Sequence, residues 1–408
     1  MNSQLYNFLH CVLLLLLMAT APFVCAQSIG SHDSVEPNTP TRIIVGAEQM
    51  ELIEQQTQGK SVAVVANQAS LVKGKHLVDT LLAKGIDIKR IFCPEHGFRG
   101  DSEAGASVKD GIDATSCLPL VSLYGKNIKP TPNQLNDITL VIFDLQDVGC
   151  RFYTYISTLH YVMEACAENH VPLLLLDRPN PNAHYVDGPV LEPAYRSFVG
   201  MHPVPIVYGM TIGEYATMIN GECWLSDSLQ CDLTVVALQN YTHDSCYHLP
   251  IAPSPNLQTD QAIALYPSLC LFEGTNISVG RGTDSPFEII GNPRYKPLPA
   301  SANSITFTPR SIPHVCNRPP FEGTKCYGMS LKEEPRPTQI NLDYLIEMYR
   351  GTPHNSFFLK NNFFEKLAGT AMLRKQLQQG ATAQEIRDSW EPALSLFKEI
   401  RSHYLLYK

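Results

Sequence analysis

The sequence lacks the short motifs that mark several common enzyme classes. Its first predicted strand is followed by Ala66-Asn67-Gln68-Ala69-Ser70 rather than by Gly-x-Gly-x-x-Gly, which disfavours a dinucleotide cofactor. It contains no Gly-x-x-x-x-Gly-Lys-Ser/Thr loop for nucleotide phosphates, no Gly-x-Ser-x-Gly elbow for acyl transfer and no Cys-x-x-Cys pair. We therefore expect no cofactor, and neither an NTPase, a conventional esterase nor a thioredoxin-like protein.

The chain also lacks an excess of basic residues. Its 31 Lys and Arg against 39 Asp and Glu give a net charge of −8, so the composition does not indicate the basic surface that binds nucleic acid. Of the 408 residues, 44% are hydrophobic and 17% are charged, which is typical of a globular protein rather than a disordered one. We expect partners to be small molecules.

Long apolar runs are missing beyond the N-terminus. Residues 12–18 are Leu, Val and Met, a run too short to span a bilayer, and Val24-Cys25-Ala26 follows as a small-residue cleavage pattern. We interpret residues 1–26 as a signal peptide cleaved near Ala26 and residues 27–41 as a linker, and we expect an exported, periplasmic protein without a membrane span. Lipoprotein anchoring at Cys25 is the less favoured alternative, because Phe23 is large for that processing site.

Ten cysteines remain after the leader, at irregular spacings. Cys93, Cys166 and Cys270 lie in apolar segments, where buried free thiols are common. We expect mostly free cysteines, with a Cys316–Cys326 bridge as the alternative.

Short apolar runs alternate with helical patterns in the first half of the chain. Strands are predicted over 61–66, 90–93, 118–122, 140–143, 173–176 and 233–237, and helices over 48–58, 77–84, 154–169 and 212–220. The runs at 140–143 and 173–176 do not alternate, as expected of strands buried on both faces. We predict an α/β fold: a Rossmann-like, doubly wound parallel sheet domain over 42–243, followed by a smaller C-terminal α+β domain over 244–408, where Pro, Gly and Asn cluster.

Polar residues follow three of the predicted strands, where an open parallel sheet places its ligand crevice. The candidates are Glu95, His96 and Arg99 after the second strand, Asp144, Gln146, Asp147, Arg151, Tyr153 and Tyr155 after the fourth, and Asp177, Arg178 and Asn180 after the fifth. With Asp101, Glu103 and Glu288 they predict a carboxylate-rich rim beside arginines. Such a rim suits cleavage of a glycosidic bond, in which a protonated carboxyl donates to the leaving oxygen.

Glu95 is the best candidate for that acid. It directly follows a buried strand, Pro94 and Gly97 restrict its turn, and Phe98 offers apolar cover that favours the neutral carboxyl. The adjacent His96 orients the carboxyl or the sugar in this interpretation. The alternatives are a structural glutamate and a solvent-facing histidine, and for each arginine an internal ion pair in place of an anionic substrate group.

At these residues the sequence resembles the bacterial exo-β-N-acetylmuramidases of the NamZ type. The blocks that carry the resemblance appear in family order from about residue 42 to the C-terminus. They are residues 94–100, 144–149, 151–155, 177–181, 253–256, 272–276 and 280–283. Cys150 is a departure, at a position where we expect a small residue such as Ala.

The resemblance implies a Rossmann-like domain joined to a smaller, β-barrel-like domain, with the active site in the cleft between them. It implies removal of β-1,4-linked N-acetylmuramic acid from the non-reducing end of peptidoglycan fragments, such as MurNAc-GlcNAc and muropeptide-derived glycans, in wall turnover or recycling. Glu95 matches the proposed catalytic glutamate, and Arg281 or Arg151 would hold the lactyl carboxylate. Further binding contacts are expected from the second domain, at Asn256, Glu273, Asn276, Arg281, Thr283 and Glu288.

The second catalytic group is left open by the sequence. A retaining, an inverting and a substrate-assisted route are all compatible with it, the last with Asp147 or Tyr155 polarising the 2-acetamido group. Two other functions compete: a metal-dependent hydrolase with His96, Asp144 and Asp147 as ligands, and a catalytically silent muropeptide-binding protein. The oligomeric state is not predicted.

Overall fold

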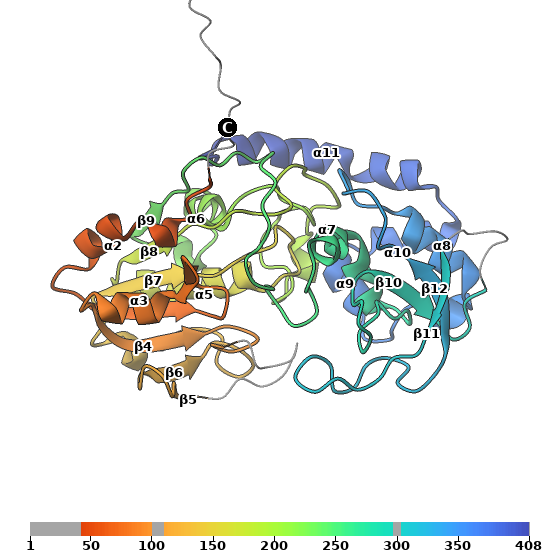
Figure 1. The fold of residues 1–408 in the computed structure, drawn as a ribbon. Helices are drawn as coiled ribbons and strands as arrows, with labels where there is room; N and C mark the ends of the chain where they lie inside the picture. Colours follow the sequence, from red (N-terminus) through yellow and green to blue (C-terminus); the bar gives the residue numbers. More distant parts are fainter. Residues whose placement is uncertain (1–41, 100–109, 297–302, 408) are drawn as a thin grey trace, which may run out of the picture. The chain divides into compact units, whose positions relative to one another are not determined.

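A computed structural model describes residues 42–99, 110–296 and 303–407, in which two larger sheets, a short hairpin and their helices are assigned (Figure 1). The strands are β1 (Ser61–Ala66), β2 (Leu71–Val72), β3 (Lys75–His76), β4 (Asp87–Cys93), β5 (Gly111–Ile112), β6 (Pro119–Ser122), β7 (Leu140–Asp144), β8 (Leu173–Leu176), β9 (Leu233–Val236), β10 (Ile289–Asn292), β11 (Ser304–Phe307) and β12 (Cys326–Ser330). The α-helices are α2 (Met50–Thr57), α3 (Leu77–Ala83), α4 (Pro132–Leu135), α5 (Tyr155–Glu168), α6 (Ile212–Gly221), α7 (Asp260–Leu269), α8 (Asp343–Gly351), α9 (Phe363–Ala368), α10 (Met372–Gln379) and α11 (Ala383–Ser402). Short 3₁₀ turns are η1 (Gly46–Glu48), η2 (Pro193–Tyr195), η3 (Ser226–Ser228), η4 (Cys270–Gly274) and η5 (His354–Ser356).

The central sheet has seven strands in the order β5-β6-β4-β1-β7-β8-β9. All pairs are parallel except β5 with β6. The six parallel strands follow the Rossmann order, in which the direction of winding reverses between β1 and β7. The predicted doubly wound sheet is therefore confirmed, and the reversal point locates the crevice at the carboxyl ends of these strands.

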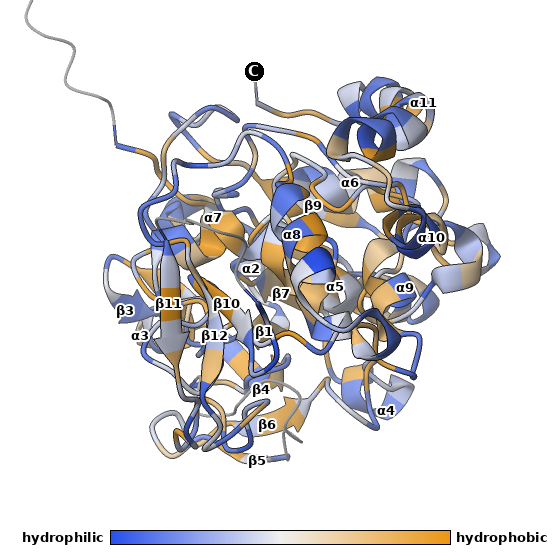
Figure 2. Cartoon of the chain, turned by 90° about the vertical axis from the view of Figure 1, so that its right-hand side faces the viewer, coloured by the Kyte–Doolittle hydropathy of each residue, from blue (hydrophilic) through white to orange (hydrophobic). Residues whose placement is uncertain are grey.

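Successive residues of a central strand point to opposite sides of the sheet, and each side has its own hydrophobic core. Ala63 and Val65 pack with the core that contains α5 and α6, whereas Val62 and Val64 pack with the core that contains α2 and α3. Burial on both sides explains why the strands are apolar runs without alternation. Apolar residues are correspondingly concentrated in the central strands (Figure 2).

The predicted elements agree closely with the observed ones. β1 and β8 have the predicted bounds, and β4 begins at Asp87, three residues before the predicted start at Arg90. The β2–β3 hairpin and the edge strand β5 were not predicted, because two residues carry too little periodicity to detect.

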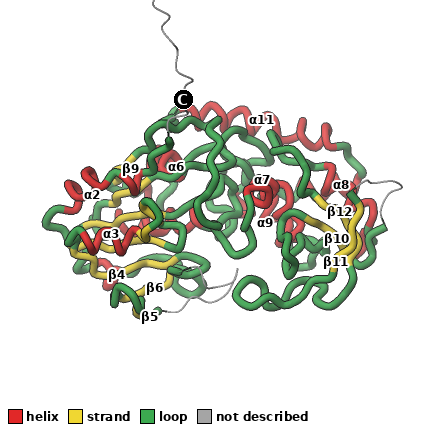
Figure 3. Tube along the Cα trace, viewed as in Figure 1, coloured by secondary structure: helices red, strands yellow, loops and turns green. Residues whose placement is uncertain are grey.

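The C-terminal part contains a smaller antiparallel sheet in the order β10-β12-β11, with long connecting loops and helices (Figure 3). The described strands thus form an open three-stranded sheet in place of the expected barrel-like arrangement. Cys326, on β12, is a free buried thiol, so the alternative bridge to Cys316 is not formed.

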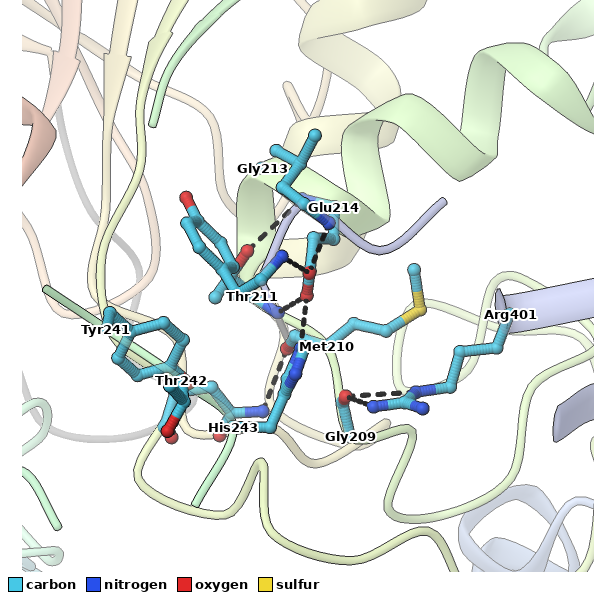
Figure 4. Close-up of polar contacts among 12 residues, drawn as sticks. Gly209, Met210, Thr211, Gly213, Glu214, Tyr241, Thr242, His243 and Arg401 are labelled. Carbon is cyan, nitrogen blue, oxygen red and sulfur yellow. Dashed lines mark hydrogen bonds and ion pairs between the residues drawn. The ribbon is translucent and has the colours of Figure 1, made fainter. Parts of the chain in front are cut away.

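Helix α11 is tied to the loop before α6. Glu214 accepts hydrogen bonds from the backbone N–H of Thr211 and from His243 Nε2, each at 2.9 Å, while Arg401 Nε donates to the Gly209 carbonyl at 3.0 Å (Figure 4). Since Thr211 and Glu214 form a capping box at the start of α6, the same carboxylate caps one helix and holds the loop beside it.

From Arg42 onward the chain forms one compact unit. The predicted domain boundary at 243/244 stays a prediction, and the predicted signal peptide and linker lie outside the described residues. No described helix combines the length and apolar character needed to cross a membrane.

Candidate active site

A cavity of about 910 Å³ lies at the carboxyl ends of the parallel strands. One part of its wall follows β4 and β6 and precedes α5, and the other comes from η4, the turn around Arg281 and the β11–β12 connection. The lining residues are Glu95, His96, Tyr124, Phe152, Tyr153, Thr154, Phe198, Val199, Ser254, Leu257, Tyr266, Glu273, Arg281, Phe287, Val315, Cys316, Asn317, Arg318, Pro320 and Phe363.

Glu95 stands in a tight turn directly after β4. The turn is closed by a hydrogen bond from the Gly97 N–H to the Pro94 carbonyl at 3.1 Å. His96 adopts a φ of 71° although it carries a side chain, and it is buried. Such conformations are uncommon for residues other than glycine and cluster at functional sites, so the turn has the character of an active-site loop.

Two hydroxyl groups contact the Glu95 carboxylate. Thr154 Oγ1 donates to Glu95 Oε2 at 2.8 Å, and burial, the charge of Glu95 and a hydrogen bond to it raise the pKa of the Tyr124 hydroxyl. Thr154 is the residue before α5, yet its hydroxyl does not cap the helix, because it is directed to Glu95. Glu95 is therefore held at the positive end of a 14-residue helix.

Two tyrosines, Tyr155 and Tyr153, pack beside the turn that carries Glu95. The Tyr155 hydroxyl accepts from Asn67 Nδ2 at 2.7 Å and lies 3.4 Å from the Glu95 carbonyl oxygen. Tyr153 lines the cavity, packs edge-on against Tyr155 with ring centres 4.7 Å apart, and donates to the Pro253 carbonyl at 2.8 Å. The side chain of Tyr155 is buried behind the lining.

The other wall of the cavity carries an ion pair. Arg281 Nε donates to Glu273 Oε1 at 2.7 Å, and the guanidinium lies 5.2 Å from the centre of the Phe287 ring. Although burial lowers it, the charge of Glu273 raises the pKa of Arg281 above its ordinary value. Of the predicted site residues, Glu95, His96, Tyr153, Glu273 and Arg281 are thus brought together around one cavity.

Most of the other predicted residues form a buried layer beneath the lining. Arg178 and Asp144 make a bidentate pair with distances of 2.5 and 2.8 Å. Asp177 accepts from the backbone N–H groups of Arg178 and Gly213, and from the hydroxyls of two further side chains. Burial raises the pKa of Asp177 to about 6. These groups anchor the loops after β7 and β8, and a direct substrate role for them stays a prediction.

Asp147 is enclosed in the same layer. Its Oδ2 accepts from the Gly149 N–H at 2.6 Å and from the Tyr208 hydroxyl, whereas its buried Oδ1 has no hydrogen-bond partner among the described residues. Burial raises the pKa of Asp147 to about 6. Gln146 donates from Nε2 to the Pro179 carbonyl at 2.7 Å, and so links the loops after β7 and β8.

Asn180 fills the space left by a glycine. Its Nδ2 donates to the Met210 carbonyl at 2.8 Å, and a Cβ on Gly149, whose φ is 73°, would lie 2.2 Å from Asn180 Oδ1. Asn180 therefore holds the 149 turn rather than lining the cavity.

Arg99 and Arg151 do not line the cavity. Arg99 pairs with Asp113 at 2.8 Å, the internal ion pair that was the alternative interpretation. Arg151 is fully buried, and its guanidinium donates to the carbonyls of Pro189, Val204 and Leu367 at 2.6–2.9 Å. The structure thus gives Arg151 no access from the cavity to a lactyl carboxylate.

The remaining predicted residues of the C-terminal part hold turns. Asn256 Nδ2 donates to the Val315 carbonyl at 3.1 Å, and Thr283 Oγ1 donates to the Gly280 carbonyl at 2.6 Å. Glu288 accepts from the Thr259 hydroxyl, and the Asn276 N–H donates to the Phe357 carbonyl at 2.6 Å. None of these four predicted residues is in the described cavity lining, and their binding roles stay predictions.

Fifteen lining residues were not predicted as site residues, and three of them carry polar or charged groups that matter for the chemistry proposed below: Tyr124, Thr154 and Arg318. Tyr124 follows β6 and could have been found by examining a fourth strand end with the rule applied to the other three. Thr154 lies within a block that the resemblance already covered. Arg318 lies in a loop without periodicity and carries no comparable signal.

The residues named for a metal site are not brought together. Within residues 42–99, 110–296 and 303–407, no group of three or more His, Cys, Asp or Glu is placed to hold a metal ion. Asp144, one of the three, is paired with Arg178. Asp101 and Glu103 lie outside the described residues.

Comparison with known proteins identifies the family of the chain. Two family models match the chain: the N-terminal part of the exo-β-N-acetylmuramidase NamZ at residues 62–261 and its C-terminal part at residues 264–407. The peptidoglycan β-N-acetylmuramidase NamZ of Bacillus subtilis (strain 168) is 39% identical over 372 residues, covering 87% of this chain and 88% of that protein.

Two crystal structures of DUF1343 family proteins from Bacteroides fragilis share the fold. One is 44% identical with a TM-score of 0.82 and the other 27% identical with a TM-score of 0.76, and each match covers 90% of this chain and 99% of the other. With both halves matched in order and a relative of this identity along most of its length, the chain belongs to the NamZ family of exo-β-N-acetylmuramidases.

Proposed function

We propose that this protein is an exo-acting glycosidase that releases terminal β-1,4-linked N-acetylmuramic acid from peptidoglycan fragments in wall turnover or recycling. The observation that carries the proposal is the placement of Glu95 in the cavity lining, with its carboxylate held by Thr154 and Tyr124. The family membership supplies the substrate class, and the cavity offers the polar and aromatic surface that a sugar requires.

In this proposal Glu95 donates a proton to the oxygen of the leaving sugar as the glycosidic bond breaks. The fixed hydroxyl of Thr154 stabilises the negative charge that develops on the carboxylate, because charge-assisted hydrogen bonds are stronger than neutral ones. His96 lines the cavity next to Glu95 and is within the same turn, so it is placed to contact the substrate or the carboxyl.

Glu273 is the other carboxylate that the structure places in the described lining. If it stabilises the sugar cation or activates the water, it does so while ion-paired with Arg281. Asp147 and Tyr155 lie behind the lining, so a substrate-assisted route through either of them requires the acetamido group to reach past Tyr153 or its neighbours. The anomer first released distinguishes retention from inversion.

The test is incubation of the mature chain with MurNAc-β-1,4-GlcNAc, with the released sugar followed by NMR from the first minutes. Release of N-acetylmuramic acid is expected, and Glu95→Gln should lower kcat by about 10²–10⁴-fold while the disaccharide still binds. The matched control is Glu192→Gln, because Glu192 is exposed and lies outside the cavity lining, and this variant should keep the activity of the wild type. Full kcat in Glu95→Gln would remove Glu95 from this role, and binding without turnover by the wild type would identify a muropeptide-binding protein instead.

We further propose that the chain is exported to the periplasm and cleaved near Ala26. The apolar run at 12–18 and the small residues at the cleavage pattern support this. N-terminal sequencing of the protein recovered from the periplasmic fraction should begin at about residue 27. A lipid-modified N-terminus at Cys25 would overturn the proposed cleavage.

A further inference from the structure

The charged groups in the cavity lining are unevenly paired. Arg281 is bonded to Glu273, and Glu95 accepts from Thr154. Arg318 is exposed in the lining, and no hydrogen bond or ion pair joins it to any residue in the described part of the chain. The cavity thus presents one guanidinium whose donors are all available to a ligand.

The loop that carries Arg318 is anchored, although the side chain itself is exposed. The Arg310 N–H donates to the Gly282 carbonyl at 2.8 Å, and Asn256 Nδ2 donates to the Val315 carbonyl at 3.1 Å. Gly282 has a φ of 78°, and a Cβ there would lie 2.5 Å from Pro319 Cγ. The turn next to Arg281 and the residue next to Arg318 are therefore packed against each other, and both arginines line the same cavity.

The substrate class offers one anion for this cation. N-acetylmuramic acid carries a lactyl carboxylate, and a guanidinium is the preferred protein partner of a carboxylate because it can donate two parallel hydrogen bonds. Arg281 already has one N–H engaged by Glu273, and its charge is balanced there. Arg151, the other residue considered for this role, is buried among carbonyl groups.

We infer that Arg318 binds the lactyl carboxylate of the terminal N-acetylmuramic acid, and thereby selects this sugar over N-acetylglucosamine, which lacks the group. The inference rests on the proposed function. Because Arg318 is exposed in the wall and contacts the sugar away from the glycosidic oxygen, it acts as a specificity residue rather than a catalytic one. Its removal should raise KM more than it lowers kcat.

The test compares 4-nitrophenyl β-N-acetylmuramide with its analogue in which the lactyl carboxylate is a neutral amide. Arg318→Gln should lower kcat/KM for the acid by about 10- to 100-fold and leave kcat/KM for the amide within about 2-fold. Arg318→Lys keeps the charge without the planar donors and should fall between the two. Arg310→Gln is the matched control on the same loop, since Arg310 is exposed and pairs with Asp284 at 2.7 Å outside the lining.

Calorimetric titration with free N-acetylmuramic acid and with its lactyl amide gives a readout that does not need turnover. The wild type should bind the acid more tightly, and Arg318→Gln should lose that preference. Equal losses on acid and amide, or an unchanged preference in Arg318→Gln, would overturn the inference. Failure of the wild type to hydrolyse either glycoside would instead refute the proposed function, while the titration would still decide the role of Arg318.

Discussion

Replacing Thr154 with valine should lower kcat with little change in KM. Valine has nearly the shape of threonine but carries a methyl group in place of the hydroxyl that donates to Glu95 Oε2 at 2.8 Å. That hydroxyl makes no capping bond to the N–H groups of α5, so its loss does not uncap the helix. The perturbation is therefore confined to the Glu95 carboxylate.

The size of the effect follows from the kind of hydrogen bond that is lost. A hydrogen bond to a charged group contributes about 1.5–3 kcal/mol, and about 1.4 kcal/mol corresponds to a tenfold change in rate. If the bond strengthens as charge develops on Glu95, its loss lowers kcat by about 10- to 150-fold. Because Tyr124 also contacts Glu95, we expect the lower part of this range.

The assay is the initial rate of MurNAc-GlcNAc hydrolysis over a range of substrate concentrations. Thr154→Ser keeps the hydroxyl and should retain most of the activity, and thermal unfolding should show similar Tm values for both variants. A kcat for Thr154→Val within about 2-fold of wild type would refute the reasoning. Equal impairment of the serine and valine variants would do the same, because the hydroxyl would then not be the relevant group.

Three further predictions concern the layer beneath the site and its outer wall. Arg178→Ala should lower the free energy of unfolding by about 3–5 kcal/mol, because it leaves Asp144 buried without its bidentate partner; a loss below about 1 kcal/mol in denaturant unfolding would contradict this. Burial raises the pKa of Asp177 to about 6 from 3.8, so the stability that its protonated form contributes is full below about pH 4 and is lost as the pH rises through 6. Asp147, whose pKa is also raised to about 6, contributes the same kind of dependence to both proteins. Denaturant unfolding at several pH values should therefore show a pH dependence that is larger by about 3 kcal/mol in the wild type than in Asp177→Asn, whereas equal slopes would argue against it. Gly282→Ala, with φ at 78° and its Cβ 2.5 Å from Pro319 Cγ, should lower Tm and raise KM for the disaccharide, while unchanged KM would show that the wall tolerates the shift.

The sheet could be predicted because its determinants are local. Each strand is a short apolar run, and the buried runs at 140–143 and 173–176 showed that helices cover both faces. Glu95 could be found for the same reason, because a residue that directly follows a strand of a parallel sheet lies at the crevice. The pattern of apolar residues is sufficient to predict the strands, and the position of Glu95 after one of them is sufficient to predict that it lies at the crevice.

The pairing of the polar residues could not be predicted in the same way. Asp144 is the last residue of β7 and Arg178 follows β8, but their bidentate contact removes both from the cavity and depends on β7 and β8 being neighbours. The carbonyls that hold Arg151 come from residues 189, 204 and 367, which no spacing in the sequence connects. Sequence reasoning identified the polar layer and assigned it to the substrate, whereas the structure shows that much of it positions the loops.

There is a physical reason why some polar residues line the cavity and others form the buried layer beneath it. A loop that must present Glu95 and Tyr153 in fixed positions contains backbone groups and charges that cannot be left unpaired away from water. The buried Asp144–Arg178 ion pair and the hydrogen bonds that Asp177 accepts satisfy such groups in the loops after β7 and β8, whereas Glu95 and Arg318 line the cavity. Polar residues at the ends of parallel strands therefore either hold a loop in place or are available to bind a ligand. The side chains available to a ligand are those that line the cavity, and Arg318, in the β11–β12 connection, is one of them.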